Sequence, residues 1–401
     1  MSIEPRAAPS QFAAKLRLAL GGRAGWRGFA FQLLFAAALA WVGYEIVANA
    51  RANLAAQRIT SGFGFLENTA GFDVSQALIP YSGSDTYTRV LFVGLLNTLL
   101  VSIMGIFFAT VIGFVVALGR LSPNWLLSRI AGGYVELLRN LPLLFQILFW
   151  YLAVLGALPN PRQSISLFGM FFLSNRGFVV PRPIADPGLL PFALAILIAI
   201  VAAIALRHYA RQQLFDHGRK ITIWPYVLGL LIGLPLLCAL VFGVPVTFEI
   251  PVLKGFNFSG GSRLIPEFVA LLLALSTYTA SYIAEIVRGG ILSVHKGQME
   301  AGSSLGLHRG EALRLIVVPQ ALRVILPPLT NQYLNLTKNS SLAVAIGYPD
   351  LVSVFAGTTL SQTGQAIEII AITMGVYLLI SLTTSAIMSF YGWRISRSLG
   401  P

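Results

Sequence analysis

The chain has 401 residues, of which 56% are apolar and only 11% are charged, and its mean hydropathy is +0.76. A soluble domain carries about 25% charged residues, so the composition excludes an ordinary soluble protein and indicates a polytopic membrane protein. The net charge of +13 would suit a nucleic-acid-binding protein, but the membrane topology described below accounts for it, and we expect no nucleic acid partner. The single cysteine, Cys238, excludes a disulfide within the chain.

A membrane-spanning helix needs about 20 predominantly apolar residues, and about eight segments of the chain are suited to this role. They cover residues 28–50, 89–119, 130–157, 189–206, 224–243, 264–290, 320–340 and 366–392. Pro142 predicts a kink in the third of these spans, because it frees the carbonyl of Leu138 from its helical hydrogen bond. The sequence therefore predicts an all-α, polytopic fold.

The basic residues set the orientation of the spans, because cytoplasmic loops carry an excess of Lys and Arg. Most of the 28 basic residues fall on one side of the membrane if both termini are cytoplasmic. This topology also predicts attraction to anionic membrane lipid. It divides the chain into a basic cytoplasmic tail at 1–27, a first span at 28–50, a periplasmic segment at 51–88, a membrane domain at 89–392 and a cytoplasmic tail at 393–401.

The stretch 295–322 is polar although it lies between two apolar spans, and the topology places it in the cytoplasm. Residues 298–305 predict a short helix that Gly306 ends in the left-handed conformation. Residues 311–318 predict a second short helix, in which Glu311 and Arg314 are paired, before Pro319 begins the return to the membrane. The exposed tip mixes apolar and basic side chains, which suits docking to another protein, although a solvated loop is the plainer alternative.

A spaced motif in this stretch favours docking. Glu300-Ala301-Gly302 is followed by Gly306 and, after nine further residues, by Ile316-Val317-Val318-Pro319. This spacing resembles the coupling loop of permease subunits of ATP-binding-cassette (ABC) importers, in which the pattern is Glu-Ala-Ala, Gly and Ile-x-Leu-Pro. Gly302 replaces an alanine of that pattern, which predicts a weakening of the first helix by about 1 kcal/mol. The resemblance assigns ATPase coupling to Glu300, Ala301, Gly302, Gly306, Leu307, His308, Arg309, Ile316 and Pro319.

Three longer stretches, 134–156, 278–302 and 319–351, resemble the permeases for polar and general L-amino acids. The resemblance covers about 89–392 and implies a type I ABC importer permease with a five-helix core, located in the bacterial inner membrane. It also implies a second, related permease subunit, a homodimer of ATP-binding subunits, a periplasmic substrate-binding protein and an L-amino acid substrate. The first span and an inserted helix pair at about 158–262 depart from the five-span minimum.

The sequence contains no Gly-x4-Gly-Lys-Ser/Thr loop that would cradle ATP phosphates. We therefore expect no cofactor on this chain and no enzymatic activity of its own, with ATP and Mg²⁺ bound to a partner ATPase. An ion-coupled secondary transporter is the alternative. It is disfavoured because no inverted pair of Gly/Pro-broken spans is evident. An enzyme embedded in the membrane has little support, because neither a nucleophile with its base nor a metal-ligand cluster is visible.

Ionisable side chains inside the predicted spans are functional candidates, because they are costly to place in lipid. Glu136 and Arg139 are three residues apart, as are Glu285 and Arg288. Both pairs lie near the cytoplasmic ends of their spans, where Arg side chains reach the membrane surface. We interpret both as structural ion pairs that brace the helices near the coupling loop.

The seventh span carries polar residues on one helical face: Asn331, Asn335 and Lys338. These residues are candidates for a translocation path, since amides and a cation can contact the charged groups of an amino acid. A hydrated seam against a second permease subunit explains them equally well. Thr279 and Ser281 in the sixth span are further candidates, although hydrogen bonding between helices accounts for them adequately.

Overall fold

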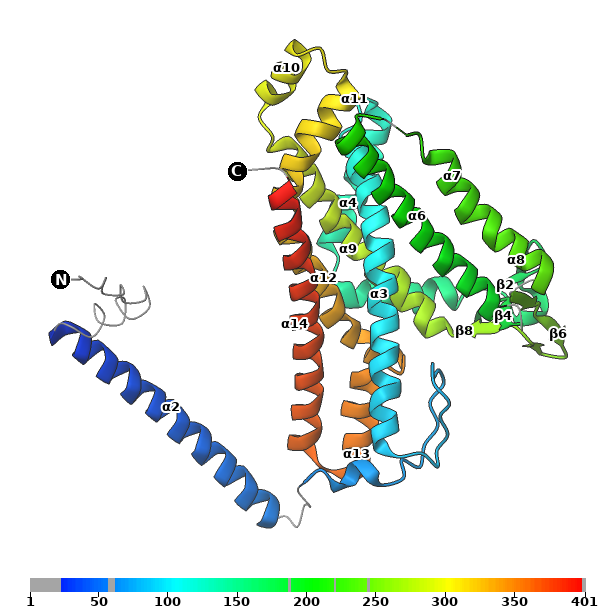
Figure 1. Ribbon diagram of the computed structural model, residues 1–401. Coiled ribbons are helices and arrows are strands. Elements are labelled where there is room, and N and C mark those ends of the chain that lie inside the picture. Colours follow the sequence, from blue (N-terminus) through cyan, green and yellow to red (C-terminus); the bar gives the residue numbers. More distant parts are fainter. Residues whose placement is uncertain (1–22, 57–61, 187–188, 220, 244–245, 399–401) are drawn as a thin grey trace, which may run out of the picture.

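The structure is a computed structural model that describes residues 23–56, 62–186, 189–219, 221–243 and 246–398. In these residues, seven helices are long and apolar enough to span a membrane, or eight if one sharply bent helix pair counts as a span. Most of the predicted tail at 1–27 lies outside the described residues. The predicted all-α polytopic class is confirmed, and the long helices form a bundle from which one helix stands apart (Figure 1).

Apart from the third, the predicted spans correspond to long helices, several of which extend beyond the predicted ends. Their bounds are α2 Arg23–Ala56, α3 Tyr87–Arg120, α4 Trp125–Asn140, α5 Leu143–Leu148, α6 Leu189–His217, α7 Trp224–Leu228, α8 Leu234–Phe242, α9 Pro266–Leu292, α12 Val318–Asn339 and α14 Ala366–Ser398. Short π-helical segments, η2 at Phe149–Leu155 and η4 at Gly229–Gly233, extend α5 and join α7 to α8. The isolated helix is α2, and none of its most apolar window is buried in the structure.

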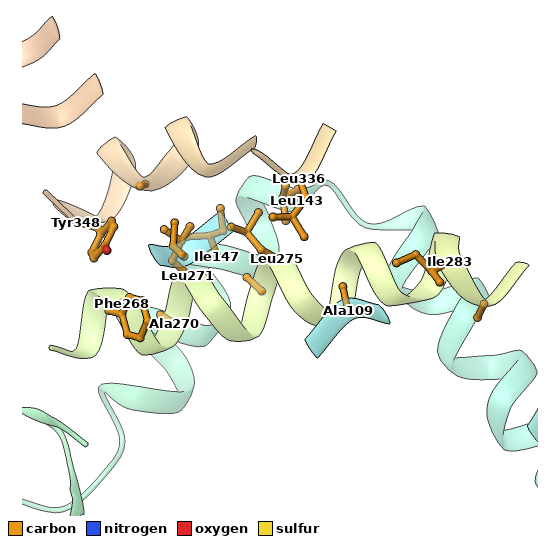
Figure 2. Close-up of a cluster of buried hydrophobic side chains, with 14 of the residues drawn as sticks. Ala109, Leu143, Ile147, Phe268, Ala270, Leu271, Leu275, Ile283, Leu336 and Tyr348 are labelled. Atoms are coloured by element: carbon orange, nitrogen blue, oxygen red, sulfur yellow. The ribbon is translucent and has the colours of Figure 1, made fainter. Parts of the chain in front are cut away.

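The core lies where α3 packs along α9, with α12 against both (Figures 1 and 2). Small residues of α3 allow the close approach, as is usual in membrane bundles. A Cβ atom on Gly113 would lie 2.7 Å from Ile283 Cβ and 3.1 Å from the carbonyl oxygen of Ala280. Ala109 and Ala117, one turn to either side of Gly113, are fully buried.

The third predicted span, 130–157, is broken rather than merely kinked. α4 and the α5–η2 segment meet at 107° across Leu141 and Pro142. Leu141 is extended, as expected of a residue before proline. The buried side chain of Gln146 satisfies the carbonyls freed at the break, because its Nε2 donates to Leu138 O at 2.9 Å and to Leu141 O at 3.1 Å.

The predicted inserted helix pair corresponds to α6 and the α7–η4–α8 segment, but eight short strands in the described residues were not expected. The strands β1 Ile165–Leu167, β2 Phe171–Ser174, β3 Gly177–Val180 and β8 Ser262–Leu264 form one antiparallel sheet. Two further antiparallel pairs join β4 Arg182–Ala185 to β5 Val246–Glu249, and β6 Val252–Lys254 to β7 Asn257–Ser259. The strands form a cap that connects the inserted helices to the start of α9.

The segment after α12 folds back into the bundle. It comprises η6 Ser340–Ile346, η7 Val352–Thr359 and α13 Leu360–Thr363. Asn97 of α3 donates from Nδ2 to Pro349 O at 2.9 Å, and Leu351 N donates to Thr98 Oγ1 at 3.0 Å. Tyr348 is fully buried and donates to Asn97 O at 3.1 Å. These contacts hold the polar turn between η6 and η7 against the N-terminal half of α3.

The close contact between α3 and α9 generates a stability prediction. Gly113→Ala places a methyl group against Ile283 and the backbone of α9, and such overpacking costs about 1–3 kcal/mol. We expect a lower midpoint of thermal unfolding in detergent. The midpoint is measured as the temperature at which half of the protein is no longer monodisperse. Gly375→Ala in α14 is the matched control, because nothing lies within 4 Å of its Cβ. Equal midpoints for both variants would contradict the packing argument.

Candidate functional site: helix α10 and its base

The candidate coupling loop forms a compact projection beyond the ends of the long helices (Figure 1). Its first helix, α10, runs over Lys296–Ser304. Gly306 lies in the left-handed region at φ +80°, and Leu307 N donates to Gly302 O at 3.1 Å beyond the helix end. This arrangement is the glycine-terminated helix end that the sequence predicts over 298–306.

The second half of the loop differs from the prediction of a separate helix at 311–318. The helix α11, Arg309–Ala312, continues through a π-helical segment, η5 Leu313–Val317, directly into α12. Glu311 caps the start of this helix, since its Oε2 accepts a hydrogen bond from His308 N at 3.0 Å. The carboxylate acts on the backbone, and the predicted pairing with Arg314 is not formed. The projection is thus joined rigidly to a membrane helix on this side.

Gly302 is the residue that lets the two halves of the projection close on each other. It is buried, and a Cβ atom there would lie 2.8 Å from Ile316 Cδ1 and 3.4 Å from Ala312 Cβ. Gly302 therefore does more than weaken α10. The end of the Ile316 side chain occupies the space that a side chain at position 302 would need. The nearest atom is the free end of a flexible side chain, so an alanine would need only a small shift of Ile316.

The tip of the projection is exposed and mixed in character. Leu305 is 82% exposed, and His308 and Arg309 are also exposed, whereas Leu307 is half-buried with its Cδ1 near Gly302. Sequence reasoning missed Leu305, although an apolar residue directly before the terminating glycine was a signal for it. An exposed leucine beside basic groups suits docking to a protein surface.

The remaining coupling candidates lie on the faces of the same projection. Glu300 and Ala301 are exposed on α10, and Pro319 is half-buried in the first turn of α12. The sequence-predicted residues of the loop are thus brought together in one unit, with Gly302 and Ile316 in its interior.

A cluster of charged side chains lies at the base of the projection, between α9, which leads into the projection, and the end of α3. Glu285 of α9 contacts Arg288, with 2.5 Å between Oε1 and Nη2, and also pairs with Arg120 at the end of α3. Arg120 was not among the predicted residues, because its distance in sequence hides the contact. The cluster ties the C-terminal parts of α3 and α9 together.

The predicted ion pair between Glu136 and Arg139 is not formed. The guanidinium of Arg139 lies over the Tyr282 ring, 5.1 Å from its centroid, and so points towards α9. Glu136, Arg139 and Asn140 line a polar cavity of about 380 Å³ beside Glu285. Arg139 turns to α9 because the ring face and the nearby carboxylate both attract a cation.

The candidate path residues divide into two groups. Asn331, Asn335 and Lys338 are exposed together on α12, and Lys338 lines a cavity of about 490 Å³ between α12 and α14. Thr279 and Ser281 are buried inside the chain instead. Ser281 donates to the carbonyl of Tyr278 at 2.6 Å, so its hydroxyl is used within α9.

Metal chemistry receives no support from the described part of the chain. Within it, no group of three or more His, Cys, Asp or Glu side chains is placed to hold a metal ion. The site consists instead of the exposed projection and the ion pairs of Glu285 at its base.

Comparison with known proteins fits this arrangement. A family model described as "Binding-protein-dependent transport system inner membrane component" matches residues 109–397. The "Putative amino-acid ABC transporter permease protein YhdX" of Escherichia coli (strain K12) is 53% identical and covers 92% of this chain and 94% of its own length. The "General L-amino acid transport system permease protein AapQ" of Rhizobium johnstonii is 50% identical and covers 92% of each chain.

A further relative is the "Glutamate/glutamine/aspartate/asparagine transport system permease protein BztB" of Rhodobacter capsulatus, which is 42% identical over 90% of this chain and 91% of its own. The family match covers most of the chain, and the apolar helices agree with an inner membrane location. The chain is a transport subunit rather than an enzyme. It belongs to the family of binding-protein-dependent transport system inner membrane components, the permease subunits of ABC transporters.

Proposed function

We propose that this chain is the permease through which an ABC importer moves polar L-amino acids, or a broad range of them, into the bacterial cell. A separate ATPase drives it by docking on α10. The observation that carries the proposal is the cytoplasmic projection, in which Gly302 and Ile316 close a compact unit around an exposed tip. The named relatives that cover almost the whole chain support the amino acid substrate. They give no support to an ion-coupled transporter that works without an ATPase.

The partners follow from the division of labour that the sequence implies. The chain has no phosphate-binding loop, so ATP and Mg²⁺ belong to a homodimer of ATP-binding subunits. A periplasmic substrate-binding protein delivers the amino acid. A second, related permease subunit forms a heterodimer with this chain. This part of the proposal is supported by the exposed polar face of α12, which is unsuited to contact with lipid.

The translocation path runs along this polar face of α12. Lys338 lines the cavity between α12 and α14. Its ammonium group can bind the carboxylate that every amino acid carries. Thr279 and Ser281 are structural in this proposal, because they are buried within the chain.

The packing of Gly302 generates a prediction about coupling. Gly302→Leu should force α10 away from Ile316 and abolish ATP-driven uptake in proteoliposomes, while the permease still inserts and is recovered at normal yield. Gly302→Ala is the control, because the end of the Ile316 side chain can move, and we expect uptake within about twofold of the unsubstituted protein. Normal uptake by Gly302→Leu would contradict a coupling role for the closed projection.

Lys338 generates a second prediction. Lys338→Met keeps the aliphatic chain and removes the charge, and losing a charged hydrogen bond of about 1.5–3 kcal/mol should raise the KM for amino acid uptake by about tenfold or more. Binding of the ATPase subunit should be unchanged. Lys254→Met, in the strand cap, is the matched control for loss of a lysine. Unchanged uptake of every amino acid tested would exclude Lys338 from the path.

A further inference from the structure

An open cleft lies between the inserted helices, away from the residues proposed for coupling and for the translocation path. α6 packs against α8, where Ala195 and Ala199 are buried. Towards its cytoplasmic end, α6 is separated from the α7–η4 segment by a cleft of about 460 Å³. This volume falls within the range of about 300–1,000 Å³ that is typical of small-molecule sites.

The walls of the cleft are apolar. Ile200 and Ile204 contribute from α6, and Val227 and Leu231 contribute from the opposite segment. A cleft with such walls, at membrane depth, favours hydrocarbon over water.

The mouth of the cleft is basic and aromatic, with Arg207 and Trp224 in its lining. The apolar run 189–206 of α6 measures about 27 Å at 1.5 Å per residue, which places Arg207 at the edge of the hydrocarbon core. Trp224 is 69% exposed at the start of α7, as expected for a tryptophan at a membrane interface. The mouth therefore opens at the level of the lipid headgroups on the cytoplasmic side.

The charge of the mouth is not neutralised within the described part of the chain. No acidic side chain there lies within 4.0 Å of Arg207, and the same holds for Arg211 and Arg219 at the cytoplasmic end of α6. A guanidinium can bind a phosphate group through two parallel hydrogen bonds. Each basic residue near an anionic membrane surface adds about 1 kcal/mol of attraction.

We propose that this cleft binds one anionic phospholipid of the cytoplasmic leaflet. An acyl chain lies along Ile200, Ile204, Val227 and Leu231, and the headgroup phosphate contacts Arg207 beside Trp224. The apolar walls match the acyl chain of such a lipid, and Arg207, which has no ion-pair partner among the described residues, matches its phosphate. The site lies on the inserted helices and does not depend on which solute the permease carries.

The test uses the full chain, purified in detergent, stripped of lipid and titrated with phosphatidylglycerol or with phosphatidylcholine of the same acyl chains. Native mass spectrometry counts the bound lipids. We expect one phosphatidylglycerol to bind at least fivefold more tightly than phosphatidylcholine, and Arg207→Gln to remove this preference. Ile204→Trp, which fills the cleft, should weaken binding of both lipids.

The matched control is Arg129→Gln. Arg129 is also an exposed arginine near a tryptophan, with its guanidinium 6.0 Å from the Trp125 ring centroid, but it does not line the cleft. The Arg129→Gln variant should therefore bind both lipids as the unsubstituted protein does. Equal affinity for the two lipids, or equal losses in Arg207→Gln and Arg129→Gln, would overturn the proposal. Competition by inorganic phosphate as strong as that by phosphatidylglycerol would show an anion site without an acyl chain and would also overturn it.

Discussion

The contact between α3 and α9 at Gly113 is the constraint on which the rest of the structure depends. A side chain on Gly113 would collide with Ile283 and the backbone of α9, so the two helices approach as closely as their backbones allow. This approach brings the end of α3 to the end of α9, where Glu285 pairs with Arg120 and Arg288. The projection begins within four residues of the end of α9, and its first half is therefore attached to the helix that packs along α3.

The second half of the projection is attached differently. From Arg309 to Ile346 the chain is helical without interruption, so the projection, the membrane helix α12 and the polar face at Lys338 form one continuous element. A displacement of the tip can be carried along this element, because coupling between distant sites needs a physically contiguous rigid connection. The two halves of the projection meet at Gly302, where Ile316 lies against α10.

Local patterns in the sequence predicted those parts of the fold that depend on local chemistry. Hydropathy located the spans, and the left-handed preference of glycine located the end of α10 at Gly306. Contacts between distant segments were not predictable in this way. Arg139 follows Glu136 at helical spacing but turns to Tyr282 of another helix, and Glu285 gains Arg120 from α3.

Two further differences have physical causes that act beyond a sequence window. Pro142 predicted a kink, but the 107° break also needs Gln146 to satisfy the freed carbonyls, and a lone glutamine carries no such signal. The strands between the inserted helices are three or four residues long, which is too short for a clear alternation of polar and apolar residues. The glycine at position 302, where the family pattern has alanine, is explained by Ile316. That side chain occupies the space next to Gly302, and no local pattern in the sequence indicates the contact.

The central claim, that the projection around α10 receives an ATPase subunit, is tested most directly by crosslinking. A photoreactive phenylalanine analogue placed at Leu305 should form an adduct with the ATP-binding subunit in inner membrane vesicles. The same analogue at Phe256, in the turn of the strand cap and 68% exposed, should form none. An adduct from position 305 alone is the predicted result. No adduct at 305, or equal adducts from both positions, would contradict the account.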